Sequence, residues 1–246
     1  MLPDDLTGYL AELTERLRGV LDPELLGIYV GGSVALGAYL AGRSDVDVAA
    51  VVAGLLPIAQ KKAVVDAARH ESLPCPARGL ELVVYPRTAT ESAVADPGFE
   101  VELNTGAGMP FVANFDPAGA AATHWYAIDR AILAERGRPL LGPPVSELFA
   151  PVPPEIALAA LVDSLRWHAE TEVAPSAEAV LNTCRALRYA RERVWSSKPE
   201  AAEWARGRTT DDDLVEAAVE ARLAGGRLDP ARVARFVVAA RRELGS

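Results

Sequence analysis

Cysteine is scarce in this chain, which has two in 246 residues. Cys75 and Cys184 lie far apart and lack the close spacing of metal-binding cysteines, so we expect both to be reduced thiols. Long apolar runs are missing too, because none approaches the roughly 18 to 20 residues of a membrane span. The stretch 1–19 is acidic and amphipathic, without the basic-then-apolar order of a signal peptide. These features favour a cytoplasmic protein that does not enter a membrane.

An excess of positive charge is also absent. The chain has 25 Lys and Arg against 34 Asp and Glu, a formal net charge of −9. This balance argues against a general nucleic-acid binder, which normally carries a basic face, and it is compatible with a protein that handles cations. Half of the residues are apolar, as in globular proteins. The length allows one large or two ordinary domains, and we expect a monomer.

The most informative stretch contains two aspartates at the start of a buried strand. Asp45 and Asp47 open the apolar run 46–52, and they point to the same side because side chains alternate along a strand. Two adjacent carboxylates repel each other unless a cation lies between them. Mg²⁺ is commonly held by such carboxylates together with substrate phosphates. The pattern therefore predicts a Mg²⁺ site, with an ordinary solvent-facing strand as the alternative.

A turn of small residues, Gly31-Gly32-Ser33, precedes this strand, with eleven residues between Ser33 and Asp45. The glycines let the backbone turn tightly, and Ser33 places a hydroxyl near the start of a short helix, where anions are favoured. Ser44 either caps the turn before the strand or hydrogen-bonds an aspartate. The combination of this turn with D-x-D resembles the signature of the polymerase-β-like nucleotidyltransferases. On this resemblance we take Gly32, Ser33 and Ser44 as candidate nucleotide-binding residues.

A third acid, Glu81, is the single charged residue in the apolar run 79–85. If this run is a strand beside the one that carries Asp45 and Asp47, Glu81 reaches the same side of the sheet. A carboxylate there can act as a third metal ligand or as a general base. The alternative is that Glu81 faces solvent on a half-buried strand.

Periodicity and turn residues predict two domains. The first, 1–150, is an α+β nucleotidyltransferase domain, a mixed sheet with flanking helices. Its expected strands are 25–30, 46–52, 79–85 and 109–115, its expected helices are 4–21, 33–40, 57–71 and 123–135, and a loop covers 88–104. Five prolines between Pro143 and Pro154 mark the boundary. The second domain, 151–246, is an all-helical bundle with helices at 154–172, 176–195, 199–206, 210–223 and 230–243.

Two further segments narrow the resemblance. The linker 142–153, GPPVSELFAPVP, and the segment 180–205, with Leu181, Arg185, Lys198 and an A-A-x-W-A ending, are similar to the aminoglycoside adenylyltransferases. These resistance enzymes transfer AMP onto streptomycin and spectinomycin. The similarity touches most of the chain.

This resemblance implies a set of roles. Asp45, Asp47 and Glu81 would hold Mg²⁺ at the ATP phosphates, and Glu81 would take the proton from the attacking hydroxyl. Arg185 and Lys198 would contact the triphosphate, and pyrophosphate would leave. The drug would bind between the domains, where an acidic lining suits a polycation. Candidates for that lining are Glu170, Glu172 and Glu178.

The chain departs from the resistance enzymes between Tyr85 and Ala118, where no counterpart of their aromatic-bearing loop is found. Since that loop helps to select the drug, the acceptor can differ while the AMP-transfer chemistry stays. Two alternatives are therefore kept. One is a nucleotidyltransferase that acts on another hydroxylated metabolite or on a protein, and the other is a non-catalytic nucleotide-binding regulator. The three acids together disfavour the regulator.

Overall fold

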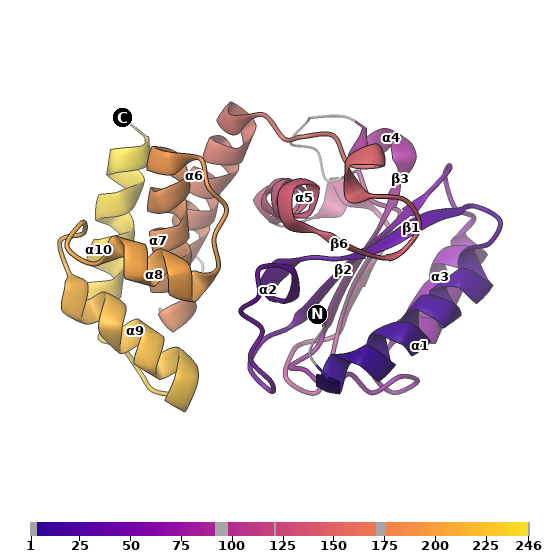
Figure 1. Cartoon of the computed structure of the whole chain (residues 1–246), viewed down its shortest axis with the longest axis horizontal. Helices are drawn as coiled ribbons and strands as arrows, with labels where there is room; N and C mark the ends of the chain where they lie inside the picture. The colour runs from indigo at the N-terminus through magenta and orange to yellow at the C-terminus, as the bar shows by residue number, and fades with distance from the viewer. Residues whose placement is uncertain (1–3, 92–97, 121, 171–175, 246) are drawn as a thin grey trace. The chain divides into compact units, whose positions relative to one another are not determined.

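The structure, a computed structural model, describes residues 4–91, 98–120, 122–170 and 176–245. The chain divides into two compact units, Met1–Val152 and Pro153–Ser246, which we describe separately (Figure 1). Within the described ranges, none of the helices combines the length and apolar character needed to cross a membrane.

A six-stranded mixed sheet forms the centre of the first unit, with the strand order β5-β4-β3-β2-β1-β6. β2 and β3 run parallel, and the other neighbouring pairs are antiparallel. The strands are β1 (Leu25–Val30), β2 (Val46–Val52), β3 (Leu80–Pro86), β4 (Val101–Thr105), β5 (Val112–Asn114) and β6 (Arg138–Leu141).

Helices cover both faces of this sheet, so alternate strand residues enter two separate cores (Figure 1). α1 (Asp4–Leu21) and α3 (Ile58–Ala68) pack side by side on one face, over Val48, Ala50 and Leu82 among others. α5 (His124–Arg136) lies on the other face, in a core that contains Ala49, Val51, Tyr85, Tyr126 and Leu133. Because odd-numbered residues of β2 and β3 face α5, Asp47 and Glu81 lie on the α5 side.

Three local predictions for the first unit were wrong. The helix expected at 33–40 is a single turn, α2 (Gly32–Ala35), which ends before Gly37 at φ +70°. The loop expected at 88–104 contains α4 (Arg87–Thr90) and β4, whose buried and half-buried residues alternate over only five positions. β6 was not predicted, because it has four residues and includes Pro139, which an edge strand tolerates.

The second unit is helical, as predicted. α7 (Ala177–Glu192) is its central helix and contacts α6 (Pro154–Glu170), α8 (Lys198–Ala205), α9 (Asp212–Ala224) and α10 (Pro230–Leu244). Side-chain caps begin four of these helices, from Ser176, Ser197, Asp211 and Asp229. The expected fold class, a mixed sheet with flanking helices followed by a helical region, is therefore confirmed.

Candidate active site

The turn after β1 packs directly against the carboxylate of Asp47. The Gly31 N–H donates a hydrogen bond to the Asp47 carbonyl oxygen at 2.9 Å, which extends the β1–β2 ladder. Gly32 has φ +47°, and a Cβ atom built on it would lie 1.7 Å from Asp47 Oδ2. Only glycine fits this position, on both backbone and steric grounds. The turn and the second aspartate of D-x-D therefore form one packed unit.

Asp47 and Glu81 are neighbours across two parallel strands. Asp47 is the register partner of Glu81 in the β2–β3 pair, and Glu81 is in turn the partner of Asn104 in β4. The structure thus places the third acid on the strand next to the D-x-D strand, on the same face of the sheet. Asp45, Asp47 and Glu81 are all half-buried, so their carboxylates remain accessible to a ligand.

The surroundings of Glu81 oppose its negative charge. Desolvation raises the pKa of Glu81 well above its usual range, and repulsion by Asp45, Asp47 and Asp129 raises it further. Arg78 opposes this shift. The side chain of Glu81 is 37% exposed, and the three nearby carboxylates add their repulsion to the effect of burial. A carboxylate with a raised pKa is a stronger proton acceptor than an ordinary glutamate.

Asp129 was missed by the sequence analysis. It lies on α5, four residues before Leu133, so the two side chains share a helix face. Leu133 contacts the glycine turn, since a Cβ on Gly31 would lie 3.0 Å from Leu133 Cδ2. That face of α5 therefore brings Asp129 towards the three acids on the sheet. In the sequence Asp129 is one acid on an amphipathic helix, and the topology is needed to place it.

Arg78 supplies a cation inside the acidic cluster. Its Nη2 lies 2.5 Å from Asp45 Oδ2 and 3.8 Å from Glu81 Oε1. In this arrangement, no three His, Cys, Asp or Glu side chains of the described ranges are gathered closely enough to hold a metal ion. The donor chemistry of Asp45, Asp47 and Glu81 nevertheless suits Mg²⁺, which prefers oxygen ligands, and their mutual repulsion would favour it.

The two serines of the motif differ in their surroundings. Ser33 Oγ is buried and has no hydrogen-bond partner within the described part of the chain. The Ser44 hydroxyl accepts a hydrogen bond from the Leu40 N–H at 3.1 Å and so closes the turn before β2. Capping the turn was one of the two roles expected for Ser44. That Ser44 also binds the nucleotide stays a prediction.

Lys198 and Arg185, the candidates from the second unit, both take part in polar contacts there. Lys198 Nζ forms an ion pair with Glu178, and Arg222 Nη1 contacts the same carboxylate at 2.8 Å. Burial opposes the charged form of Glu178, but Lys198 and Arg222 outweigh it and lower the pKa of this group. Arg185 Nη1 lies 3.4 Å from Asn182 Oδ1.

The three glutamates expected to line a drug site are not equivalent. Glu178 is neutralised by its two cations, and Glu170 is paired with Arg241 at 3.2 Å. Glu172 lies outside the described residues.

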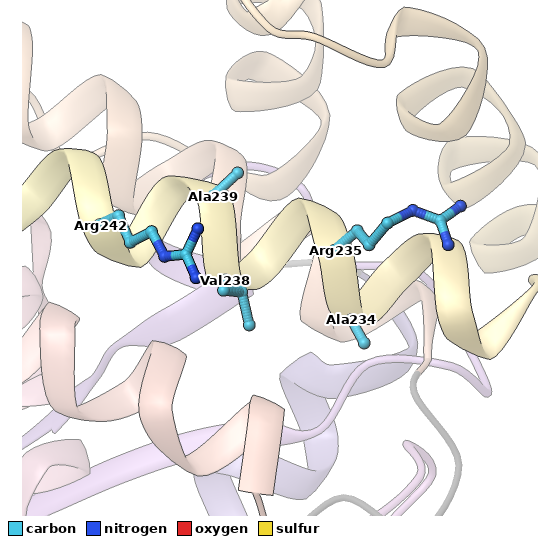
Figure 2. A pocket seen from close by; sticks show the side chains of 5 residues that line it. All are labelled: Ala234, Arg235, Val238, Ala239 and Arg242. Atoms are coloured by element: carbon cyan, nitrogen blue, oxygen red, sulfur yellow. The ribbon is translucent and has the colours of Figure 1, made fainter.

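A hollow on the second unit does not include any predicted site residue. Figure 2 shows this hollow, of about 460 Å³, on α10. Its lining residues are Ala234, Arg235, Val238, Ala239 and Arg242. All five come from one face of α10, and the residues of the acidic cluster are not among them.

Comparisons with known proteins agree with this picture. Residues 147–243 match the family model described as "Aminoglycoside adenylyltransferase, C-terminal domain". Among solved structures, the chain is similar to the spectinomycin adenyltransferase AAD(9) from Enterococcus faecialis, with a TM-score of 0.75 and 16% sequence identity over 97% of this chain and 99% of that chain. No curated protein matches the sequence. At this identity the structural likeness shows a shared fold. Together these findings confirm the predicted resemblance to the aminoglycoside adenylyltransferases and the prediction of a nucleotidyltransferase enzyme, and the family model matches residues 147–243.

Proposed function

We propose that this enzyme transfers AMP from ATP to a hydroxyl of an aminoglycoside antibiotic of the spectinomycin or streptomycin type, with Mg²⁺, and releases pyrophosphate. The observation that carries the proposal is the placement of Glu81 beside Asp47 on the face where the Gly32 turn meets Asp47. The crystal structure of AAD(9), which shares the fold, contains ATP and spectinomycin and supports this choice of substrates.

Glu81 is proposed as the general base. It would take the proton from the acceptor hydroxyl while that oxygen forms a bond to the α-phosphorus of ATP. The bond from this phosphorus to the leaving oxygen then breaks, and pyrophosphate departs. The direction of the Glu81 pKa shift suits this role, because a carboxylate with a raised pKa is a stronger base.

Asp45, Asp47 and Glu81 are proposed as the residues that would hold Mg²⁺. When bound there, the ion offsets negative charge on the phosphoryl oxygens. Glu81 then has two proposed roles, since one of its two oxygens can contact the ion while the other takes the proton.

Other residues are proposed to hold the nucleotide. Gly32 lets the backbone approach a phosphate, and Ser33, whose buried hydroxyl has no partner within the described ranges, would donate a hydrogen bond to a phosphate oxygen. Ser44 is kept as a further candidate. Arg185 and Lys198 of the second unit are proposed as cations for the triphosphate, because a highly charged anion needs charge-assisted donors.

The direct test is Mg²⁺-dependent pyrophosphate release from ATP with spectinomycin, streptomycin or kanamycin added singly. We expect release with spectinomycin or streptomycin and none with kanamycin. If no pyrophosphate is released with any of the three drugs although ATP binds in a Mg²⁺-dependent way, these antibiotics are rejected as acceptors. The acceptor would then be another hydroxylated metabolite or a protein.

A second experiment tests the base. Glu81→Gln should retain ATP binding and lose turnover, because the amide cannot accept the proton. Glu12→Gln is the control, since Glu12 is 52% exposed on α1, the helix that covers the opposite face of the sheet. Normal turnover by the Glu81 variant would exclude Glu81 as the base.

A further inference from the structure

Arg78 lies where one guanidinium nitrogen contacts two of the three proposed metal ligands. Its Nη2 is 2.5 Å from Asp45 Oδ2 and 3.8 Å from Glu81 Oε1. Its side chain is 42% exposed, whereas that of Asp45 is 27% exposed. The positive charge therefore sits at the solvent side of the cluster and reaches inward between two carboxylates.

The backbone holds Arg78 in this position from both sides. Its N–H donates to the Ser44 carbonyl oxygen at 3.0 Å, and its own carbonyl oxygen accepts from the Gly108 N–H at 2.9 Å. A Cβ on Gly108 would lie 2.6 Å from Arg78 Cγ, so the absence of a side chain at Gly108 makes room for the arginine stem. The position of Arg78, two residues before β3 and three before Glu81, is therefore fixed by the fold.

Two carboxylates, those of Asp45 and Glu81, pair with this guanidinium. Asp47 lies next to Glu81 as its register partner on the neighbouring strand. Asp45, Asp47 and Asp129 all repel the charge of Glu81, and Arg78 opposes this repulsion. Carboxylates placed this closely favour a positive charge among them, either a bound metal ion or an internal side chain. Arg78 supplies such a charge to Asp45 and Glu81.

We propose that Arg78 is an internal counter-ion of the proposed metal site, which pairs with Asp45 and Glu81 and competes with Mg²⁺ for these carboxylates. This inference rests on the proposed function, because it concerns the same three acids. Mg²⁺ requires oxygen ligands at about 2.0–2.1 Å in near-octahedral geometry. A guanidinium bonded to Asp45 and lying between Asp45 and Glu81 occupies that space, and two cations in contact repel each other. Arg78 therefore lowers the affinity of the enzyme for the metal.

The test measures metal binding in the absence of turnover. Mn²⁺, which also prefers carboxylate ligands, is titrated into the full-length protein without nucleotide, and free Mn²⁺ is followed by electron paramagnetic resonance. In Arg78→Met we expect the Kd for Mn²⁺ to fall about two- to fivefold, the size expected for one exposed ion pair. Saturating Mn²⁺ should also raise the Tm of Arg78→Met by more than it raises the wild-type Tm, because a ligand stabilises the state that it binds.

Arg87→Met is a matched control. Arg87 Nε lies 2.5 Å from Glu91 Oε1, and the arginine side chain is 47% exposed, so the pair resembles Arg78–Asp45 outside the cluster. We expect its Kd for Mn²⁺ to equal that of the wild type. Arg78→Lys, which keeps the charge and the stem, should give a smaller gain in affinity and provides a second variant if the methionine variant folds poorly.

Three outcomes would overturn the inference. They are an unchanged or higher Kd in both Arg78 variants, an equal gain in Arg87→Met, and Mn²⁺ binding that persists in Asp47→Asn. The proposed function fails separately. If Mn²⁺ binds as expected but no drug is adenylylated, the counter-ion role of Arg78 stands while the acceptor or the reaction is rejected. If the wild type binds no Mn²⁺, the metal site and the role of Arg78 are rejected together.

Discussion

Gly32 and Asp47 are packed so closely that a single methyl group on Gly32 would lie 1.7 Å from Asp47 Oδ2. The contact joins the turn after β1 to the strand that carries the acids, and it depends on a positive φ at Gly32. Because Gly32 packs so closely against Asp47 Oδ2, the turn constrains where the carboxylate of Asp47 can point.

Gly32→Ala should therefore impair AMP transfer. The added methyl group pushes the Asp47 carboxylate away, and the left-handed backbone adds strain of about 1–2 kcal/mol. Gly37→Ala is the control, because Gly37 has φ +70° but no atom within 4 Å of an added Cβ. Both variants share the backbone strain, and Gly32→Ala should lose somewhat more stability in urea unfolding because it adds the clash with Asp47. Only Gly32→Ala should lose kcat/KM, by about 10- to 100-fold if the displaced carboxylate is a metal ligand. Equal activities in the two variants would contradict this role of the contact.

Ser33 and Ser44 allow a second comparison. Removing the Ser33 hydroxyl should leave the free energy of unfolding unchanged, because this buried oxygen has no partner within the described ranges. Ser44→Ala should cost about 1 kcal/mol, since it removes the acceptor for the Leu40 N–H. Equilibrium binding of Mg²⁺-ATP should weaken about tenfold in Ser33→Ala, as expected for one hydrogen bond to a charged phosphate. A Ser33→Ala variant that binds ATP like the wild type would remove Ser33 from the nucleotide site.

The strands that carry the acids could be predicted from local sequence. The apolar runs around Asp45, Asp47 and Glu81 have the length and composition of buried strands, and β2 begins and ends where it was expected. The sequence alone could not predict whether the strand with Glu81 lies beside the strand with Asp47. Strand order is set by long-range pairing, and the parallel β2–β3 register supplies the answer.

The charges that complete the cluster could not be predicted in this way. Arg78 lies in the bend before β3, and Asp129 lies on the helix α5. Neither residue belongs to a local sequence motif. Their importance comes from their proximity to Asp45, Asp47 and Glu81 in the folded chain, which cannot be read from the sequence. The same limit explains β6, whose four residues become a strand only because β1 offers a free edge.

The two cysteines provide a probe for each unit separately. Cys75 is 6% exposed in the first unit and Cys184 is 0% exposed in the second, and burial raises the pKa of Cys184 to about 12. Since the thiolate is the reactive form, neither thiol should react with iodoacetamide at pH 8 in the native protein. In a urea series analysed by mass spectrometry, Cys75 and Cys184 should become labelled at the unfolding midpoints of their own units. Rapid labelling of either cysteine without urea would contradict the burial on which the prediction rests.

Lys198 should stabilise the second unit in a pH-dependent way. Burial disfavours the charge of Glu178, but Lys198 and Arg222 prevail and lower the pKa of Glu178 below its unfolded value. A carboxyl group with a lowered pKa stabilises the folded state at neutral pH, and this contribution is lost as the pH falls through the folded pKa. Lys198→Met should therefore lower the free energy of unfolding at pH 7 by up to about 1 kcal/mol, because the pair is partly exposed. The difference from the wild type should shrink as the pH falls below about 4, where glutamates become protonated.

Arg206→Met is the control for Lys198→Met. Arg206 Nη1 lies 2.7 Å from Glu203 Oε2, and the two side chains are 49% and 70% exposed, so this pair should contribute little at any pH. Urea unfolding followed by circular dichroism at pH 7 and at pH 3.5 measures all three proteins. Binding of Mg²⁺-ATP at pH 7 then separates the two roles of Lys198. A structural role alone lowers stability and leaves ATP affinity unchanged, whereas the proposed contact with the triphosphate lowers both. A stability loss in Lys198→Met that stays constant between the two pH values would contradict the pairing with Glu178 as its cause.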